Sequence, residues 1–190
     1  MPTKNITAFV IAGGKSTRFG QDKLLYKLDG MPILERVTSI LKKIFGRIII
    51  IGDVSEKFGY LGFESHPDLI RGVGPIAGIY TALTISETEK NFCFAGDLPF
   101  LNADLIEYMI SVSDNYDITV PVVKSYFEAL HTIYSKNCLE YIKATVTEGN
   151  NKIIKIFEKS SLMKIEESAI IKFADPALVF KNINYIEDLK

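Results

Sequence analysis

A glycine-rich, cationic stretch follows the first apolar run of the sequence. It reads Ile11-Ala12-Gly13-Gly14-Lys15-Ser16-Thr17-Arg18-Phe19-Gly20 and is followed by Asp22-Lys23. Glycine lets the backbone approach an anion closely, while lysine and arginine bring positive charge to phosphate oxygens and to a leaving pyrophosphate. The stretch therefore predicts a binding loop for a nucleoside triphosphate.

Two common phosphate-binding motifs are excluded by spacing. Gly14-Lys15-Ser16 resembles the end of a P-loop, but the position five residues before Gly14, where that motif requires glycine, holds Phe9. The dinucleotide motif G-x-G-x-x-G fails as well, because Gly13 and Gly14 are adjacent and the next glycine is Gly20. The stretch is therefore a different kind of phosphate cradle.

Asp97 is the first candidate for metal-binding chemistry. It follows the apolar residues 91–95, which have the pattern of a strand, and it stands in the turn Gly96-Asp97-Leu98-Pro99-Phe100. Mg²⁺ is often held by one or two carboxylates, with water and substrate phosphate in its other positions, so one well-placed aspartate suffices. From the residues alone two interpretations stay open: a metal ligand, or an aspartate that shapes the turn or caps the next helix.

A second carboxylate, Asp68, precedes a glycine-containing segment that leads into a predicted helix. The segment reads Gly72-Val73-Gly74-Pro75-Ile76-Ala77-Gly78, and a helix that begins after glycine presents free N–H groups to an anion. The alternative is a structural turn in which Gly74-Pro75 starts the helix and Gly78 allows close packing. The residues alone leave both interpretations open.

These polar clusters are expected at the ends of parallel strands. Residues 6–11 and 47–51 are apolar runs rich in β-branched residues, which is typical of strands covered on both faces. Residues 32–41 have the apolar spacing of a crossover helix, with Pro32 suited to its first turn. Further along we expect helices at 76–85, 102–112, 137–147 and 153–157, and strands at 91–95, 117–122, 127–134 and 170–173.

This alternation of strands and helices predicts the fold class. We expect a single α/β domain over residues 1–190, with three layers and a doubly wound, mostly parallel sheet. In such sheets, ligands bind beyond the carboxyl ends of the strands, near the point where the strand order reverses. Each of the polar clusters above lies at such an end.

Composition narrows the range of partners. A net charge of −1 with 24% charged residues gives no basic surface for nucleic acid. No leader-like pattern opens the chain and no run approaches the roughly 18 apolar residues of a membrane span, so we expect a cytoplasmic protein without a membrane partner. Cys93 and Cys138 are expected to be reduced, packed thiols. With only His66 and His131, no zinc site is expected, and His131 is interpreted as a satisfied or site-edge residue rather than a catalyst.

The glycine-rich loop resembles the opening signature of the molybdenum cofactor guanylyltransferase family. That signature is Ala-Gly-Gly-x-Ser-x-Arg-hydrophobic-Gly closed by a lysine, and Phe19 here stands where the family usually has methionine, a size-preserving apolar change. Asp97-Leu98-Pro99-Phe100 is similar to the family's Asp-(Met/Leu)-Pro-Phe, whose aspartate binds magnesium. Asp68 with Gly74-Pro75-Ile76-Ala77-Gly78 is similar to the element whose aspartate contacts the guanine nucleotide. Phe180-Lys181-Asn182-Ile183-Asn184 resembles the family's closing element.

The resemblance implies a Rossmann-like nucleotidyltransferase fold and a Mg²⁺-dependent enzyme. Such an enzyme transfers GMP from GTP to molybdopterin carrying molybdenum, releases pyrophosphate and makes transient contact with the molybdoenzyme that receives the product. The nucleotide-binding residues that it implies are Ile11, Ala12, Gly13, Gly14, Lys23, Asp68 and Asp97. It also implies catalytic roles for Arg18, Lys23 and Asp97, with Asp97 as the metal ligand, and second-substrate binding by Gly74, Asn182 and Asn184.

The choice of base and acceptor rests on finer features. Relatives that transfer CMP tend to read Ala-Ala-Gly where this chain has Ala12-Gly13-Gly14, which favours guanine over cytosine. Glu128-Ala129 replaces the family's Gln-Pro, and Asn150-Asn151-Lys152 carries one cation where relatives tend to have an arginine-bearing helix start. The alternatives are a CTP-dependent molybdopterin cytidylyltransferase, a transferase acting on a sugar or polyol phosphate, and a GTP-binding regulator without catalysis.

Overall fold

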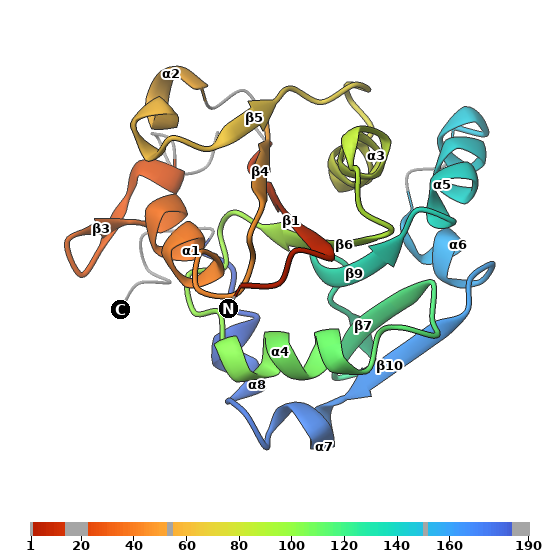
Figure 1. Ribbon diagram of the computed structural model, residues 1–190. Coiled ribbons are helices and arrows are strands. Elements are labelled where there is room, and N and C mark those ends of the chain that lie inside the picture. Colours follow the sequence, from red (N-terminus) through yellow and green to blue (C-terminus); the bar gives the residue numbers. More distant parts are fainter. Residues whose placement is uncertain (1, 14–22, 53–54, 150–151, 184–190) are drawn as a thin grey trace.

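The computed structural model describes residues 2–13, 23–52, 55–149 and 152–183 (Figure 1). Among these residues, the main sheet has eight strands, and seven of them run in the order β10-β7-β9-β6-β1-β4-β5. The eighth, β8 (Tyr126–Phe127), pairs with β7. A separate short hairpin joins β2 (Lys27–Leu28) and β3 (Met31–Pro32).

Most pairs of neighbouring strands in the sheet are parallel. On one side, β1 (Ile6–Ile11), β4 (Ile48–Ile51), β5 (Glu64–His66) and β6 (Lys90–Ala95) form a parallel group. On the other side, β7 (Ile118–Val123) and β10 (Leu162–Glu166) are parallel to each other. Between the two groups lies β9 (His131–Ser135), which is antiparallel to both β6 and β7.

Helices cover both faces of the sheet because the central strands are apolar on both sides. In β1, Ala8 and Val10 face a core that includes α1 (Ile33–Leu41) and α4 (Ala103–Ser111). Phe9 and Ile11 face a second core with α3 (Pro75–Ile85) and α5 (Cys138–Thr147). Figure 1 shows these helices on either side of the strands. The prediction of a three-layer, mostly parallel α/β fold is confirmed.

Short helical turns complete the fold. They are η1 (Lys23–Leu25), α2 (Ser55–Phe58), η2 (Gly59–Leu61), α6 (Ile154–Phe157), α7 (Glu167–Ile170) and α8 (Pro176–Val179). After α8 the chain returns to the central sheet, where Ile183 N donates to Asp97 O at 3.2 Å. The end of the described chain therefore lies beside the end of β6.

The structure corrects two of the predicted strands. Residues 127–134 do not form one strand, because β8 ends at Phe127 and β9 begins at His131. The strand predicted at 170–173 is wrong: Ile170 closes α7, and the N–H groups of Phe173 and Ala174 both donate to Ile170 O. The apolar residues there are spaced for a helical turn, and the neighbouring strand is β10, an edge strand of mixed polarity.

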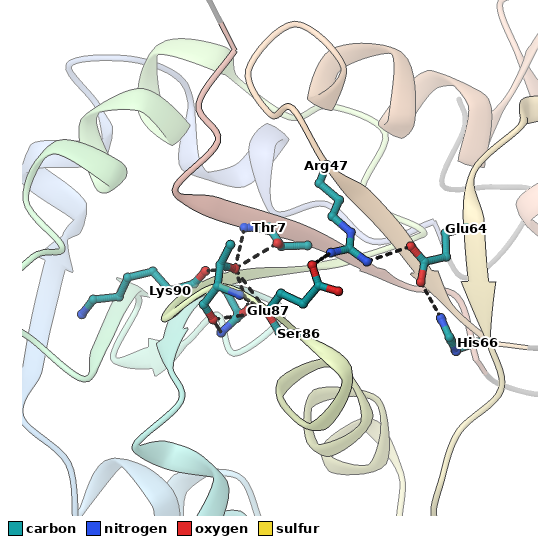
Figure 2. A network of polar contacts seen from close by, with 9 residues as sticks. Thr7, Arg47, Glu64, His66, Ser86, Glu87 and Lys90 are labelled. Carbon is teal, nitrogen blue, oxygen red and sulfur yellow. Dashed lines mark hydrogen bonds and ion pairs between the residues drawn. The ribbon is translucent and has the colours of Figure 1, made fainter.

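A polar network ties the amino ends of the central strands together (Figure 2). Thr88 Oγ1 donates to Thr7 Oγ1 at 2.9 Å. Arg47, just before β4, donates to Glu87 and to Glu64, and Glu64 also contacts the His66 ring at 2.8 Å. Most of this network lies at the opposite end of the sheet from the glycine-rich loop, so we assign it a structural role.

Candidate active site at the carboxyl edge of the sheet

Four parallel strands bring their following loops to one edge of the sheet. Ala12 N donates to Ile51 O at 2.7 Å, and Gly96 N donates to Ile11 O at 2.9 Å. Gly52 N donates to His66 O at 2.8 Å. The backbone hydrogen bonds between the strands thus continue to the end of each strand. The chain leaves β1, β4, β5 and β6 at the same edge, which is the edge where ligands bind in such sheets.

Lys23 and Asp97 meet at this edge. The Lys23 ammonium donates to Asp97 Oδ2, and the two side chains are 24% and 16% exposed. Leu24, buried next to Lys23, fixes this placement: its Cδ2 lies 3.4 Å from the point where a side chain on Gly96 would begin. Leu24 thus lies at the end of β6, and this contact places Lys23 of η1 beside the loop that carries Asp97.

The loop that carries Asp97 is held from two sides. Arg36 of α1 donates to Pro99 O at 3.3 Å, and its guanidinium lies 5.9 Å from the centre of the Phe100 ring. On the other side, Ile183 N donates to Asp97 O. The alternative that Asp97 caps the next helix is wrong, because the side chain at the α4 N-cap is Asn102, which accepts from Leu105 N at 2.8 Å.

Asp68 packs against the start of the glycine-rich loop. A Cβ on Gly13 would lie 2.9 Å from Asp68 Oδ2, and a Cβ on Gly52 would lie 3.0 Å from Gly13 N. Asp68 Oδ1 is buried and has no hydrogen-bond partner among the described residues. Burial raises the pKa of the Asp68 carboxyl above its ordinary value. The result is a buried oxygen, next to the bare Gly13 backbone, whose hydrogen-bonding capacity no described residue uses.

Helix α3 packs against β1 and against the residue that follows Asp68. Gly78 lies directly against β1, since a Cβ there would come within 2.6 Å of Ile11 Cγ2. Leu69 N, next to Asp68, donates to Thr81 Oγ1 of α3 at 2.9 Å. Exposed Gly74 is the N-cap of this helix, and its φ of 75° suits glycine. Both structural roles considered for this segment, a helix start at Gly74-Pro75 and close packing at Gly78, are thus present. They also place the N-terminus of α3 near the carboxyl edge of the sheet.

The structure gathers most of the candidate residues that it describes. At the carboxyl edge lie Ile11, Ala12, Gly13, Lys23, Asp68 and Asp97. Asn182 is exposed and directly precedes Ile183, the residue bonded to Asp97. Gly14, Arg18 and Asn184 lie outside the described residues, so their roles stay predictions.

Two residues that shape the site, Gly52 and Leu24, were not predicted from the sequence. Gly52 follows the buried run of β4 and packs on the Ala12–Gly13 peptide, with a φ of 143°. A glycine directly after an apolar run was the signal that could have identified it. Leu24 carried no such signal, because its role depends on a contact with Gly96 across the fold.

His131 differs from its sequence-based interpretation. It is buried, and neither ring nitrogen has a hydrogen-bond partner among the described residues, so the interpretation as a satisfied histidine is wrong. Burial lowers its pKa to about 3, which keeps the ring neutral. Cys93 and Cys138 are both free and buried, as expected.

The described residues contain neither a cluster of potential metal ligands nor a helix that could span a membrane. Within residues 2–13, 23–52, 55–149 and 152–183, three or more histidine, cysteine, aspartate or glutamate side chains do not gather as a metal-binding group. In the same part of the chain, every helix is too short or too polar to cross a bilayer.

Comparison with known proteins places the chain in a family. A family model described as the MobA-like NTP transferase domain matches residues 8–164. The chain belongs to this family. The matched range includes Gly13, Lys23, Asp68 and Asp97, which lie at the carboxyl edge of the sheet.

Curated relatives match almost the full length of the MobA-like chain. A protein of Natranaerobius thermophilus named a probable molybdenum cofactor guanylyltransferase is 34% identical over 194 residues, covering 99% of this chain and 95% of the relative. A relative of the same name from Thermococcus sibiricus is 37% identical, covering 95% and 94%. Among solved structures, molybdopterin-guanine dinucleotide biosynthesis protein A from Archaeoglobus fulgidus superposes with a TM-score of 0.81 at 24% identity, covering 96% and 94%, and supports the fold.

Proposed function

We propose that this chain is a molybdenum cofactor guanylyltransferase. It transfers GMP from GTP to the terminal phosphate of molybdenum-bound molybdopterin and releases pyrophosphate. The observation that carries the proposal is the convergence of Gly13, Lys23, Asp68 and Asp97 at one sheet edge, in a chain whose relatives bear that name.

Asp68 supports guanine as the base. Its buried Oδ1 lacks a partner among the described residues, and Oδ2 lies beside Gly13. Guanine presents two neighbouring N–H donors on its pairing edge, and a carboxylate accepts from both at once. Cytosine presents one amine next to an acceptor nitrogen, so it would leave one carboxylate oxygen facing a lone pair. The bare Gly13 backbone leaves room for the base to reach Asp68.

The reaction at the α-phosphate needs positioning more than a base. The acceptor phosphate is already anionic, so its oxygen forms the new bond to the α-phosphorus as the bond to the β-phosphate oxygen breaks. Pyrophosphate leaves with that electron pair. In this proposal Lys23, at the foot of the glycine-rich loop, offsets the growing negative charge on the leaving group.

Asp97 fits the role of a magnesium ligand. Its carboxylate supplies hard oxygen donors, lies at the sheet edge with partial exposure, and holds a cationic group, the Lys23 ammonium, in the structure. Bound Mg²⁺ would supply charge neutralisation on the triphosphate. Asp97 would hold the ion, and Lys23 would turn from Asp97 to the phosphates.

A nucleotide and acceptor panel tests the proposal by pyrophosphate release. We expect release from GTP with Mg²⁺ and molybdenum-bound molybdopterin, and none with sugar or polyol phosphates. Preference for CTP would support a cytidylyltransferase instead. GTP binding without turnover on any acceptor would support a regulator, and turnover on a sugar phosphate would contradict the proposed acceptor.

Asp97→Asn tests the carboxylate. Because the variant keeps the shape but removes the charge that holds a cation, we expect pyrophosphate release to fall about 10²–10³-fold, the usual effect of losing one preorganised electrostatic contact. The matched control is Asp114→Asn, an exposed carboxylate beyond the end of α4 that lies farther from Asp97 along the chain, which should keep full activity. Near-normal turnover by Asp97→Asn would remove Asp97 from the mechanism.

A further inference from the structure

The buried His131 ring is in contact with the rings of three phenylalanines. Its ring centre lies 5.4 Å from Phe92, 5.2 Å from Phe94 and 5.2 Å from Phe180, and its plane is nearly perpendicular to all three, at 90°, 87° and 89°. Phe92 and Phe94 are stacked on each other. Such edge-to-face contacts are favourable and directional, so they fix the orientation of each ring relative to the others.

Two of these rings belong to the segments that meet at Asp97. Phe94 is paired across the sheet with His131 and precedes Asp97 by three residues. Phe180 precedes Ile183 by three residues, and Ile183 N donates to Asp97 O at 3.2 Å. The two segments are thus joined twice: by the His131 ring at one end and by a backbone hydrogen bond at the other.

We infer that His131 is a positioning residue for the acceptor side of the site. Its ring holds Phe180 against β6, and through the segment Phe180–Ile183 it keeps Asn182 next to Asp97. Asn182 is exposed, while Phe180 and Ile183 are buried, so the segment presents its asparagine outward from an anchored backbone. That Asn182 meets the acceptor rests on the proposed function, whereas the anchoring itself does not.

The type of residue fits this role. Neither nitrogen of His131 has a hydrogen-bond partner among the described residues, so its position is set by ring contacts and not by a polar network. A neutral imidazole can direct its N–H at an aromatic face, which an aliphatic side chain cannot do. Leucine in place of His131 would fill similar space but could not make edge-to-face contacts with the phenylalanine rings. Phenylalanine in its place would restore them.

Hydrogen exchange tests the anchoring without any substrate. In His131→Leu we expect the Ile183 amide to exchange about tenfold faster or more than in the wild-type chain, because the segment opens locally more often. His131→Phe should restore most of the protection. The control is Ile142→Val, a buried substitution on α5 in the other core, which should leave Ile183 unaffected. Unchanged exchange at Ile183 in His131→Leu, or an equal change in Ile142→Val, would overturn the inference.

Steady-state kinetics tests the consequence for the acceptor. In His131→Leu we expect KM for molybdopterin to rise about tenfold with the Kd of GTP unchanged, and His131→Phe to recover the wild-type KM. An equal loss of GTP binding, or an unchanged acceptor KM despite faster exchange at Ile183, would overturn the positioning role. If the wild-type chain shows no guanylyl transfer, the proposed function fails, and the exchange result decides the anchoring separately.

Discussion

Lys23 and Asp97 are 74 positions apart in the sequence, and the structure joins them in one ion pair. The family resemblance implied both residues for the site, although the residues alone left Asp97 open between a metal ligand and a turn-shaping aspartate. Their pairing could not be predicted, since it depends on the packing of Leu24 beside Gly96, a contact between segments far apart in the sequence. At the residue scale, sequence therefore identified the chemical groups, and packing decided their partners.

Gly13→Ala tests the contact between the loop and Asp68. The new methyl group would lie 2.9 Å from Asp68 Oδ2, so the carboxylate must rotate away from its present place. Rotation of a side-chain end costs little stability, but it moves the proposed base-binding group. We expect the Kd of GTP to rise about tenfold, or about 1.4 kcal/mol, by calorimetry. The control Gly59→Ala meets open space and should bind GTP as the wild type does, and an unaltered Kd in Gly13→Ala would contradict the role of Asp68.

Among the helices and strands, the predictions were right for the continuous apolar strands and the long amphipathic helices of the core, but not for residues 127–134. The central strands β1, β4 and β6 and helices α1, α3, α4 and α5 lie where their spacing placed them. The short edge strand β5, Glu64-Ser65-His66, was missed because its residues are mostly polar and it is paired with only one neighbour in the described sheet. Residues 170–173 were misassigned because four apolar-rich positions fit a strand and a helical turn equally well.

The packing of α3 on β1 gives a prediction at this scale. In Gly78→Ala a methyl group would meet Ile11 Cγ2 at 2.6 Å, and overpacking of this kind costs about 1–3 kcal/mol. The higher helix propensity of alanine offsets about 1 kcal/mol of this cost. We therefore expect the free energy of unfolding, measured with urea, to be lower than in the wild type. Thr84→Ala on the exposed side of the same helix is the control and should not destabilise the chain. A Gly78→Ala chain as stable as the wild type would show that α3 can move away from β1 freely.

At the scale of the whole molecule, buried titratable groups set the response to acid. His131 has its pKa lowered to about 3 by burial, against about 6.5 in an unfolded chain. As the pH falls below about 6.5, His131 binds a proton in the unfolded state but stays neutral in the folded state. The free energy of unfolding therefore decreases until about pH 3, where the folded state also binds the proton. Asp117 has its pKa lowered to about 2, first by the hydrogen bond from Asn137 and then by Ser161 and Ser135, and its contribution is lost only below about pH 4.

The pH dependence of stability separates these two groups. Between about pH 6 and 4, the unfolding free energy of the wild-type chain should fall more steeply than that of His131→Phe, by up to about 1.4 kcal/mol per pH unit. Asp68 and Glu128, whose pKa values burial raises, act in the opposite direction in both proteins, so the difference isolates the histidine. Ile142→Val, a buried apolar substitution in the other core, is the control and should keep the slope of the wild type. Parallel curves for wild type and His131→Phe would refute the assignment.

The antiparallel strand β9 divides the sheet into two groups of parallel strands. Among the described strands, β7, β8 and β10 reach the rest of the sheet only through β9, while the loops around Gly13, Asp68 and Asp97 hang from the other group. Replacement of β7, β8 and β10 would therefore keep every strand pairing among β1, β4, β5 and β6, and with it the backbone from which those three loops leave.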